Sequence, residues 1–316
     1  MKNLKNFNLK NKSIFVAGHN GMVGSAVLNE IKKISTTILT VDKNELDLRD
    51  EKKVTKWFIK NKPQVVIIAA AKVGGIKANN IFPVDFLENN LLIQNNIIKN
   101  AFESNVEKLV FLGSSCIYPR ESLQPIKEEY LLTGSLEPTN EWYALAKLSG
   151  LKLCEAYRKQ YNCDFISLIP TNLYGPNDNF HPEYSHVPAA LIRKFHEAKT
   201  NGEKNVYVWG TGIARREFLH VSDLAKAIIF MLENYSASSP INIGTGIDIS
   251  IKEFAKMISK VVGFNGNIRF DKSKPDGMIL KRLDVSRAIK MGWNSQIDLQ
   301  NGLNITYKWA LKNIFT

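Results

Sequence analysis

The stretch "SIFVAGHNGMVGSAVLNEIKK" at residues 13–33 decides the fold class. Residues 13–18 read as a buried strand, and residues 22–33 have the apolar spacing of a helix. Gly18, Gly21 and Gly24 stand where the strand turns into the helix. Glycines there allow a sharp turn and let a pyrophosphate approach the backbone at the helix N-terminus. A glycine-rich turn can have a purely structural role. Its place after the first strand of the chain nevertheless predicts dinucleotide binding.

The same alternation continues for about 150 residues after this stretch. Short apolar runs predict strands, and segments with helical spacing separate them. The predicted strands are 36–42, 64–70, 108–114 and 164–170, and the predicted helices are 51–61, 84–104 and 141–160. The run 64–70 is continuously apolar, as expected for a strand buried on both faces. We therefore predict an α/β protein with a Rossmann-type, doubly wound parallel sheet.

The regular alternation of predicted strands and helices ends after residue 170, which indicates a second, smaller lobe of mixed α/β structure. Residues 171–187 look like a loop. A helix at 188–199, strands at 205–209, 241–246 and 267–271, and helices at 251–263 and 298–314 follow. We expect a dinucleotide-binding domain at 1–175, to which 217–246 returns. Residues 176–216 and 247–316 then form the substrate-binding lobe.

Composition excludes several classes of protein. The chain has 42 Lys+Arg against 30 Asp+Glu, a formal charge of +12, but no clustered basic stripe, so we expect no nucleic-acid partner. Its three cysteines have no metal-ligand spacing, so we expect a reduced protein without a metal. Residues 1–13 lack the apolar core of a signal peptide, and the longest apolar run, 65–71, is too short to span a bilayer. We predict a cytoplasmic protein with no membrane partner.

Three polar side chains form a second pattern. Ser114 ends the predicted strand 108–114, and Tyr143 and Lys147 form a YxxxK pair in "EWYALAK" at 141–147. Residues four apart share one helical face. A phenol has a pKa of about 10, and a nearby ammonium favours the phenolate and lowers that pKa. The pair therefore predicts a proton donor to a carbonyl under reduction, with Ser114 aimed at the same carbonyl.

The residues at the end of the second predicted strand bear on which dinucleotide binds. A carboxylate such as Asp42 usually bonds the ribose 2′-hydroxyl of NAD, whereas a cation such as Lys43 suits the 2′-phosphate of NADP. Both residues can also simply face solvent in a turn. The sequence leaves NADP(H) and NAD(H) both open.

In this order the glycine turn, the serine and the YxxxK pair resemble the extended short-chain dehydrogenase/reductases, most of which process nucleotide sugars. Further stretches resemble one family within them, the GDP-L-fucose synthases, which are epimerase/reductases of GDP-4-keto-6-deoxymannose. These stretches are "AAAKVGGI" (69–76), "GSSCIYP" (113–119), "LEPTNEWYALAK" (136–147), "PTNLYGPNDNF" (170–180), "SHV" (185–187), "REFLHVSDLA" (216–225) and "KPDG" (274–277). The resemblance covers almost the whole chain.

The resemblance implies a role for a thiol and an imidazole. Cys116 is expected to be the base and His186 the acid that invert two carbons of the sugar, while Ser114, Tyr143 and Lys147 act in reduction. Without the resemblance, Cys116 would read as a small buried apolar residue. His181, in the same loop as His186, is expected to pack within the loop instead.

The resemblance also implies the binding residues and a partner. Expected cofactor contacts are Gly18, His19, Asn20, Gly21, Met22, Val23, Gly24, Asp42, Lys43, Leu112, Gly113, Ser114, Ser115, Tyr143, Lys147, Pro170, Thr171, Asn172, Leu173 and His186. Expected contacts of the GDP-sugar substrate are Asn172, Lys194, Trp209, Arg216 and Asp276. Trp209 can instead be an ordinary residue of the hydrophobic core, and Lys194 can be a solvent-exposed residue of a helix. NADP(H) is the expected cofactor, and a homodimer joined through helices of the dinucleotide-binding domain is expected.

Two other functions remain open at this level. The same residues would serve a related GDP-4-keto sugar, such as a 6-deoxyheptose or a colitose precursor. A dinucleotide fold can also act as a cofactor-sensing binding protein without turnover. Such proteins usually lack the Tyr or the Lys of the pair, and both are present here.

Overall fold

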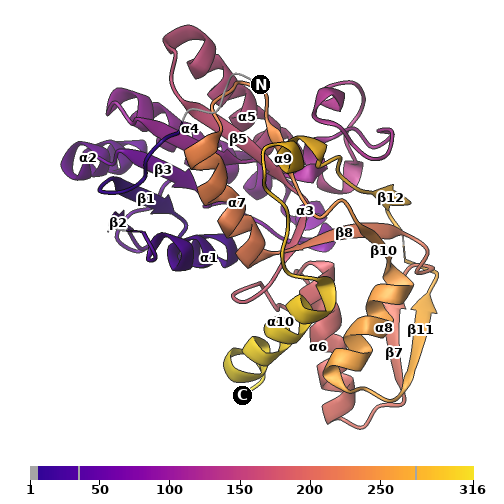
Figure 1. Ribbon diagram of the computed structural model, residues 1–316. Helices are drawn as coiled ribbons and strands as arrows, with labels where there is room; N and C mark the ends of the chain where they lie inside the picture. The colour runs from indigo at the N-terminus through magenta and orange to yellow at the C-terminus, as the bar shows by residue number, and fades with distance from the viewer. Residues whose placement is uncertain (1–5, 35, 275) are drawn as a thin grey trace.

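The computed structural model describes residues 6–34, 36–274 and 276–316 (Figure 1). Part of the basic N-terminal segment and one position of the "KPDG" stretch therefore lie outside the described residues.

A parallel sheet of six strands forms the first core. Its strands run in the order β2-β1-β3-β4-β5-β9. They are β1 (Ser13–Ala17), β2 (Thr37–Leu39), β3 (Val65–Ile68), β4 (Lys108–Leu112), β5 (Phe165–Pro170) and β9 (Ile241–Ile243). The chain leaves β1 for β2 on one side and returns to β3 on the other. Open α/β sheets bind ligands at such a switch point, beyond the carboxyl ends of the strands.

Helices cover both faces of this sheet, which confirms the predicted doubly wound architecture. Ile14 and Val16 of β1 pack in one core cluster, which also holds residues of α1 (Met22–Ile31) and α7 (Val221–Asn234). Phe15 and Ala17 pack in the other, against α2 (Glu51–Asn61), α4 (Pro83–Glu103) and α5 (Glu141–Tyr161). Successive side chains of a strand point to opposite faces, so β1, β3, β4 and β5 each contribute buried residues to both clusters, whereas β9 contributes only Ile241 and Ile243 to the first.

A second core lies below the sheet in Figure 1. Helices α6 (Val187–Thr200), α8 (Ile251–Val262) and α10 (Leu299–Asn313) pack there with β7 (Asn205–Trp209) and β11 (Asn267–Asp271). Tyr174 and Phe218 also belong to this core, so the domain boundaries at 175/176 and 216/217 stay a proposal.

Between the two cores lies a small sheet that the sequence did not predict. The expected loop 171–187 begins with β6 (Asn172–Tyr174), which pairs in parallel with β8 (Arg215–His220). Strands β10 (Asp248–Ser250) and β12 (Leu280–Lys281) pair with β8 on other residues. Runs of two or three residues are too short to show a period, so the loop prediction was wrong for residues 172–174.

Several predicted strands, among them 36–42, 64–70 and 241–246, are also shorter than expected. Strand β2 ends at Leu39 rather than at residue 42. Strand β9 ends at Ile243 because the next residues turn around the carboxylate of Glu217. Its Oε1 accepts hydrogen bonds from the N–H groups of Thr245 (2.6 Å) and Gly246 (2.8 Å), and its Oε2 from that of Leu283 (2.8 Å). Glu217 is fully buried.

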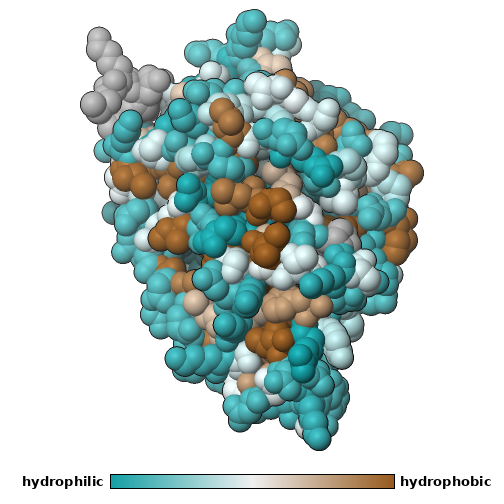
Figure 2. Space-filling view, turned by 90° about the vertical axis from the view of Figure 1, so that its right-hand side faces the viewer, coloured by the Kyte–Doolittle hydropathy of each residue, from teal (hydrophilic) through white to brown (hydrophobic). Residues whose placement is uncertain are grey.

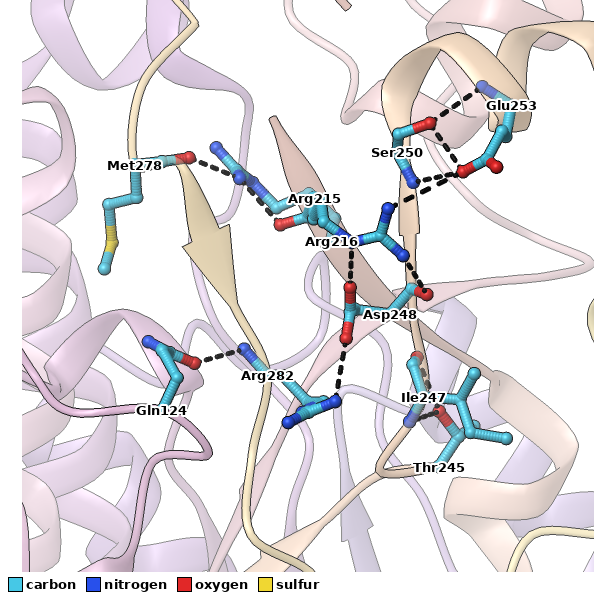
Figure 3. Close-up of polar contacts among 10 residues, drawn as sticks. All are labelled: Gln124, Arg215, Arg216, Thr245, Ile247, Asp248, Ser250, Glu253, Met278 and Arg282. Carbon is cyan, nitrogen blue, oxygen red and sulfur yellow. Dashed lines mark hydrogen bonds and ion pairs between the residues drawn. The ribbon is translucent and has the colours of Figure 1, made fainter. Parts of the chain in front are cut away.

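Figure 3 shows how Asp248 holds the small sheet together. Arg215 Nε donates to Asp248 Oδ2, and Arg282 Nη1 donates to Asp248 Oδ1 at 3.1 Å. In the register of β12 and β8, Lys281 lies beside Arg216. Because side chains alternate along a strand, the Asp248 cluster and the Arg216–Lys281 pair lie on opposite faces of this sheet.

We expect Asp248→Ala to lower the free energy of unfolding by about 2 kcal/mol, because two guanidinium groups lose their shared carboxylate. Urea denaturation followed by circular dichroism measures this loss. Asp85→Ala is the matched control, since it removes only an exposed ion pair with Lys72 and should cost less than about 1 kcal/mol. Equal losses in the two variants would show that the Asp248 cluster adds nothing to stability.

Candidate functional site

The glycine turn after β1 has the shape that a pyrophosphate requires. Gly18 has φ +85°, and the Gly21 N–H donates to its carbonyl at 3.1 Å. A Cβ at Gly24 would lie 2.1 Å from the same carbonyl oxygen, so only glycine lets helix and strand approach this closely. Helix α1 begins at Met22 without a side-chain cap, which leaves N–H groups of its first turn for an anion. These residues fit the pyrophosphate of a dinucleotide.

The expected ribose contact lies beside this turn. Asn20 Nδ2 donates to Asp42 Oδ1 at 2.6 Å, and His19 Nε2 lies 3.5 Å from the same oxygen. The carboxylate of Asp42 is thus held at the glycine turn although β2 has already ended. Lys43, the next residue, is exposed to solvent.

Ser114 and Cys116 meet at the end of β4. The Ser114 side chain caps the short 3-10 helix η1 (Ser115–Ile117) by accepting a hydrogen bond from the Cys116 N–H at 3.4 Å. The Cys116 thiol donates to the same Ser114 Oγ at 3.0 Å. Cys116 is 7% exposed, so its thiol is nearly enclosed and lies at the carboxyl edge of the sheet.

Helix α5 brings Tyr143 and Lys147 to the same edge. Lys147 Nζ donates to the Leu112 carbonyl at 3.0 Å and lies 5.9 Å from the centre of the Tyr143 ring. Among the described residues, the Tyr143 hydroxyl has no hydrogen-bond partner. It is free to donate to a ligand.

The sequence predicted that Lys147 lowers the pKa of Tyr143. This prediction was wrong for the protein without ligands. Burial raises the pKa of Tyr143, and negative charge on Cys116 raises it further. Burial also lowers the pKa of Lys147 to about 8, an effect that Cys116 opposes. The reason is that the Lys147 ammonium is bound to Leu112 and partly desolvated, so it does not offset the desolvation of the phenol. Tyr143 therefore stays protonated at neutral pH, as a proton donor must be.

His186 lies at the start of α6, where it is the N-cap residue but makes no side-chain cap. Loss of hydration lowers the pKa of its imidazole, and the positive charge of Lys281 lowers it further, although part of the residue stays exposed. This combination is typical of a side chain that lines a recess.

Lys281 is the site residue that sequence reasoning missed. Burial lowers the pKa of Lys281; negative charge on Cys116 raises it, and Arg216 lowers it, so the ammonium lies near both. Within the part of the chain that the structure describes, Lys281 has no ion pair and no hydrogen bond. No local pattern marks it, because only the pairing of β12 with β8 brings it to the site.

Arg216 is the second cation that makes no ion pair within the described residues, although the negative charges of Asp276 and Glu137 act on it. Its guanidinium donates to three backbone carbonyls, those of Arg215 (2.9 Å), Met278 (2.5 Å) and Asp276 (3.2 Å). Its neighbour Arg215 is instead neutralised by Asp248. The structure thus separates the two adjacent arginines: Arg215 is bound in an ion pair, whereas the guanidinium of Arg216 binds backbone carbonyls. Arg216 and Lys281 together suit a diphosphate.

The remaining expected substrate contacts lie around the same opening. Trp209 is 49% exposed, so it is not plain core, and the Nζ atoms of Lys194 and Lys274 lie 5.6 and 5.7 Å from its ring centre. The carboxylate of Asp276 accepts hydrogen bonds from the Thr211 N–H (2.8 Å) and hydroxyl (2.7 Å). Asp276 therefore holds the turn after β7, and its contact with a ribose stays a prediction.

A hollow of about 270 Å³ lies between residues 120–124 and 277–280, and its lining includes Met278, whose carbonyl accepts a hydrogen bond from Arg216. The face of the molecule that carries these segments is mainly hydrophilic, with apolar patches near its middle (Figure 2).

The segment from Pro170 to Leu173 closes the site from β5. The Thr171 N–H donates to the Ile243 carbonyl at 2.9 Å, and Asn172 Nδ2 donates to the Glu217 carbonyl at 2.8 Å. One N–H of the Asn172 amide is thus already used, and its oxygen remains for a ligand.

Several expected cofactor contacts can act only through the backbone. Leu112 and Ser115 are buried, and the Gly113 N–H donates to the Leu168 carbonyl at 2.8 Å. His181 stacks on Tyr184 at 4.5 Å between ring centres and lies within the loop, as expected for a packing residue.

Neither a metal centre nor a membrane span is found within residues 6–34, 36–274 and 276–316. No group of three or more His, Cys, Asp or Glu side chains there is arranged to hold a metal ion. No described helix is both long and apolar enough to cross a bilayer.

Comparison with known proteins agrees with this geometry. Residues 14–244 match the model of the NAD dependent epimerase/dehydratase family. The chain therefore belongs to that family. Within it, the chain is 54% identical over 306 residues to GDP-L-fucose synthase 1 of Arabidopsis thaliana, covering 96% of this chain and 95% of the relative.

Two solved structures are close in fold. One is a GDP-6-OMe-4-keto-L-xylo-heptose reductase from C. jejuni, with a TM-score of 0.91 and 37% identity over 96% of this chain and 98% of that one. The other is a GDP-L-fucose synthetase from Naegleria fowleri bound to NADP, with a TM-score of 0.91 and 30% identity over 100% of this chain and 98% of that one.

The lowered pKa of Lys147 predicts how stability depends on pH. In the folded protein Lys147 loses its proton near pH 8, and in the unfolded chain only near 10.5. Between these values the unfolded state binds more protons, so stability rises with pH. Relative to Lys147→Met, the wild type should gain about 2 kcal/mol of unfolding free energy between pH 8 and pH 10. Urea denaturation of both proteins across this range measures the difference, and parallel curves would contradict the shift.

Proposed function

We propose that the protein is a bifunctional epimerase/reductase that converts GDP-4-keto-6-deoxy-D-mannose to GDP-L-fucose with NADPH. The observation that carries this proposal is the convergence of Cys116, Ser114 and Tyr143 at the end of β4, next to the unpaired cations Arg216 and Lys281. A simple reductase needs no thiol at this place. The names of the relatives support the same substrate class.

The thiol and the imidazole serve the two inversions. Carbons 3 and 5 of the sugar flank the ketone, so their protons are acidic. The Cys116 thiol first releases its own proton to solvent. The thiolate then removes a proton from one face of the carbon, and protonated His186 returns one to the other face. Negative charge then develops on the oxygen at carbon 4, and the hydroxyls of Ser114 and Tyr143 stabilise it by hydrogen bonds. His186 must carry a proton before it acts as the acid, and the loss of hydration that lowers its pKa works against this.

Reduction uses the same hydroxyls. NADPH, when bound, supplies the hydride to carbon 4. Tyr143 donates the proton to the ketone oxygen, and burial keeps this phenol protonated until then. Lys147 orients the ribose of the cofactor. Its ammonium has three N–H donors, so it can bind that ribose while one of them stays on the Leu112 carbonyl.

The residues around the glycine turn would hold the cofactor. The first turn of α1 binds the pyrophosphate, and Asp42 and Lys43 face the adenosine ribose. Asp42 is already paired with Asn20 and His19, so its charge is partly offset and Lys43 can meet a 2′-phosphate. NADP in the Naegleria relative supports this choice.

The substrate's diphosphate would lie against Arg216 and Lys281, with Trp209 and Lys194 beside the nucleoside and Asp276 near its ribose. A related GDP-4-keto sugar, such as a 6-deoxyheptose or a colitose precursor, is the second candidate, because a structural relative acts on a heptose. The same residues would bind either sugar, and the shape of the pocket around carbon 6 decides which of the two is the substrate.

The cellular setting belongs to the same proposal. We propose a homodimer joined through helices of the dinucleotide-binding domain, and a cytoplasmic location where nucleotide sugars and NADPH are made. Size-exclusion chromatography with light scattering tests the first, since a monomer would contradict it.

We expect rapid oxidation of NADPH, faster than that of NADH, with GDP-4-keto-6-deoxymannose, and GDP-L-fucose as product. Absorbance at 340 nm and product identification by NMR measure both. A C4-reduced sugar with carbons 3 and 5 unchanged would show that Cys116 and His186 are idle on this substrate. No oxidation, combined with turnover of a GDP-4-keto heptose, would favour the second candidate.

Two variants separate the chemical steps. Cys116→Ala should abolish exchange of the protons on carbons 3 and 5 with D2O while ketone reduction remains measurable. Tyr143→Phe should lower the reduction rate about 100-fold or more, because the proton donor is lost. Mass spectrometry and NADPH oxidation measure the two activities. Continued exchange by Cys116→Ala would remove the thiol from the mechanism.

A further inference from the structure

The stretch "AAAKVGGI" at 69–76 has no role in the site described above, yet it contacts the loop that carries His186. Gly75 precedes helix α3 (Ile76–Ile81), which lies at the join between the two cores (Figure 1). The Gly75 N–H donates to the Tyr184 carbonyl at 2.8 Å. Tyr184 and Ser185 are the residues immediately before His186.

This contact requires glycine for reasons of space. The φ of Gly75 is −68°, which any residue adopts, so the backbone itself is not strained. A Cβ at Gly75 would lie 2.5 Å from the Ser185 carbonyl oxygen, closer than non-bonded carbon and oxygen atoms approach. Any larger residue must therefore push the Tyr184–Ser185 backbone away.

The glycine side of the contact is held firmly. Asn79 is almost fully buried, and its amide donates to the carbonyls of Gly74 (3.0 Å) and Gly75 (3.1 Å). Asn90, also buried, bonds both the N–H (2.8 Å) and the carbonyl (3.0 Å) of Lys72. The segment before α3 is thus fixed to the first core, and the loop moves rather than the glycine.

The loop side has two more contacts with the same region. Lys77 Nζ and Glu183 Oε1 lie 2.6 Å apart, and the rings of Phe82 and Tyr184 pack edge to face at 5.9 Å. Beyond the loop, the His186 carbonyl accepts a hydrogen bond from Ala190 in α6, which belongs to the second core. His186 is therefore placed by the first core on one side and by the second core on the other.

We propose that Gly75 is a positioning residue for His186, which sets the imidazole opposite Cys116 and so permits inversion without contributing to reduction. This inference rests on the proposed function. Ser114 lies at the end of β4 and Tyr143 and Lys147 lie on α5, all in the first core. Among the described residues, no hydrogen bond or ion pair joins their side chains to residues 183–186. Displacement of the loop should therefore separate the two activities.

The test is Gly75→Ala, with two readouts on the same substrate, GDP-4-keto-6-deoxymannose. Deuterium incorporation at carbons 3 and 5 should fall about tenfold or more, because a displacement near 1 Å misplaces the acid. NADPH oxidation should stay within about threefold of the wild type and yield a growing share of C4-reduced, unepimerised sugar. This change in product is the readout that loss of stability alone would not cause.

Gly134→Ala is the matched control, because a Cβ there meets only carbon atoms of the Pro119 side chain, at 3.3 Å. It should leave exchange, reduction and product unchanged. Equal losses of exchange and reduction in Gly75→Ala, or an unchanged product, would overturn the proposal.

A second variant decides the matter if Gly75→Ala does not fold. Lys77→Met removes the exposed ion pair between the same two segments, and should lower deuterium exchange about two- to threefold with reduction intact. Unchanged exchange in a folded Lys77→Met would then reject the positioning role. Failure of the wild type itself to exchange protons, by contrast, would reject the proposed function rather than this inference.

Discussion

The carboxylate of Glu217 is the interaction on which the arrangement of the site depends. It lies in β8 of the small sheet, yet it binds N–H groups of the turn after β9 in the large sheet and of Leu283 after β12. Three segments that are distant in sequence thereby meet at one buried group. Because a buried carboxylate without such donors would be costly, these segments cannot separate, and Arg216 and Lys281 stay beside the end of β4.

Burial governs the chemistry of the site as much as the choice of residues does. It keeps Tyr143 protonated and lowers the pKa values of Lys147, His186 and Lys281. Arg216 and Lys281 form no ion pair with any described residue, and a dianionic ligand would offset their charge. A site with excess positive charge in a poorly hydrated recess attracts a diphosphate and strengthens each hydrogen bond to the sugar.

Most of the first core could be predicted from the sequence, because its strands and helices are long enough to show a period. Strands β6, β10 and β12 could not, since two or three residues carry no pattern. The same limit hid Lys281, which reaches the site only through the register of β12 with β8. The pKa of Tyr143 was misjudged for another reason: a lysine four residues away suggests an ion pair, but the Leu112 carbonyl binds that ammonium instead.

The place of His186 between two cores has an evolutionary consequence under the proposed chemistry. Every group needed for ketone reduction belongs to one core, whereas inversion needs an acid that the start of α6 delivers from the other. The two activities therefore have separate structural supports within one active site. A descendant of this chain can give up inversion and keep reduction through changes at Gly75 or the residues that it contacts, without any change in the groups that bind the sugar, so reductases without epimerase activity are a short mutational distance away.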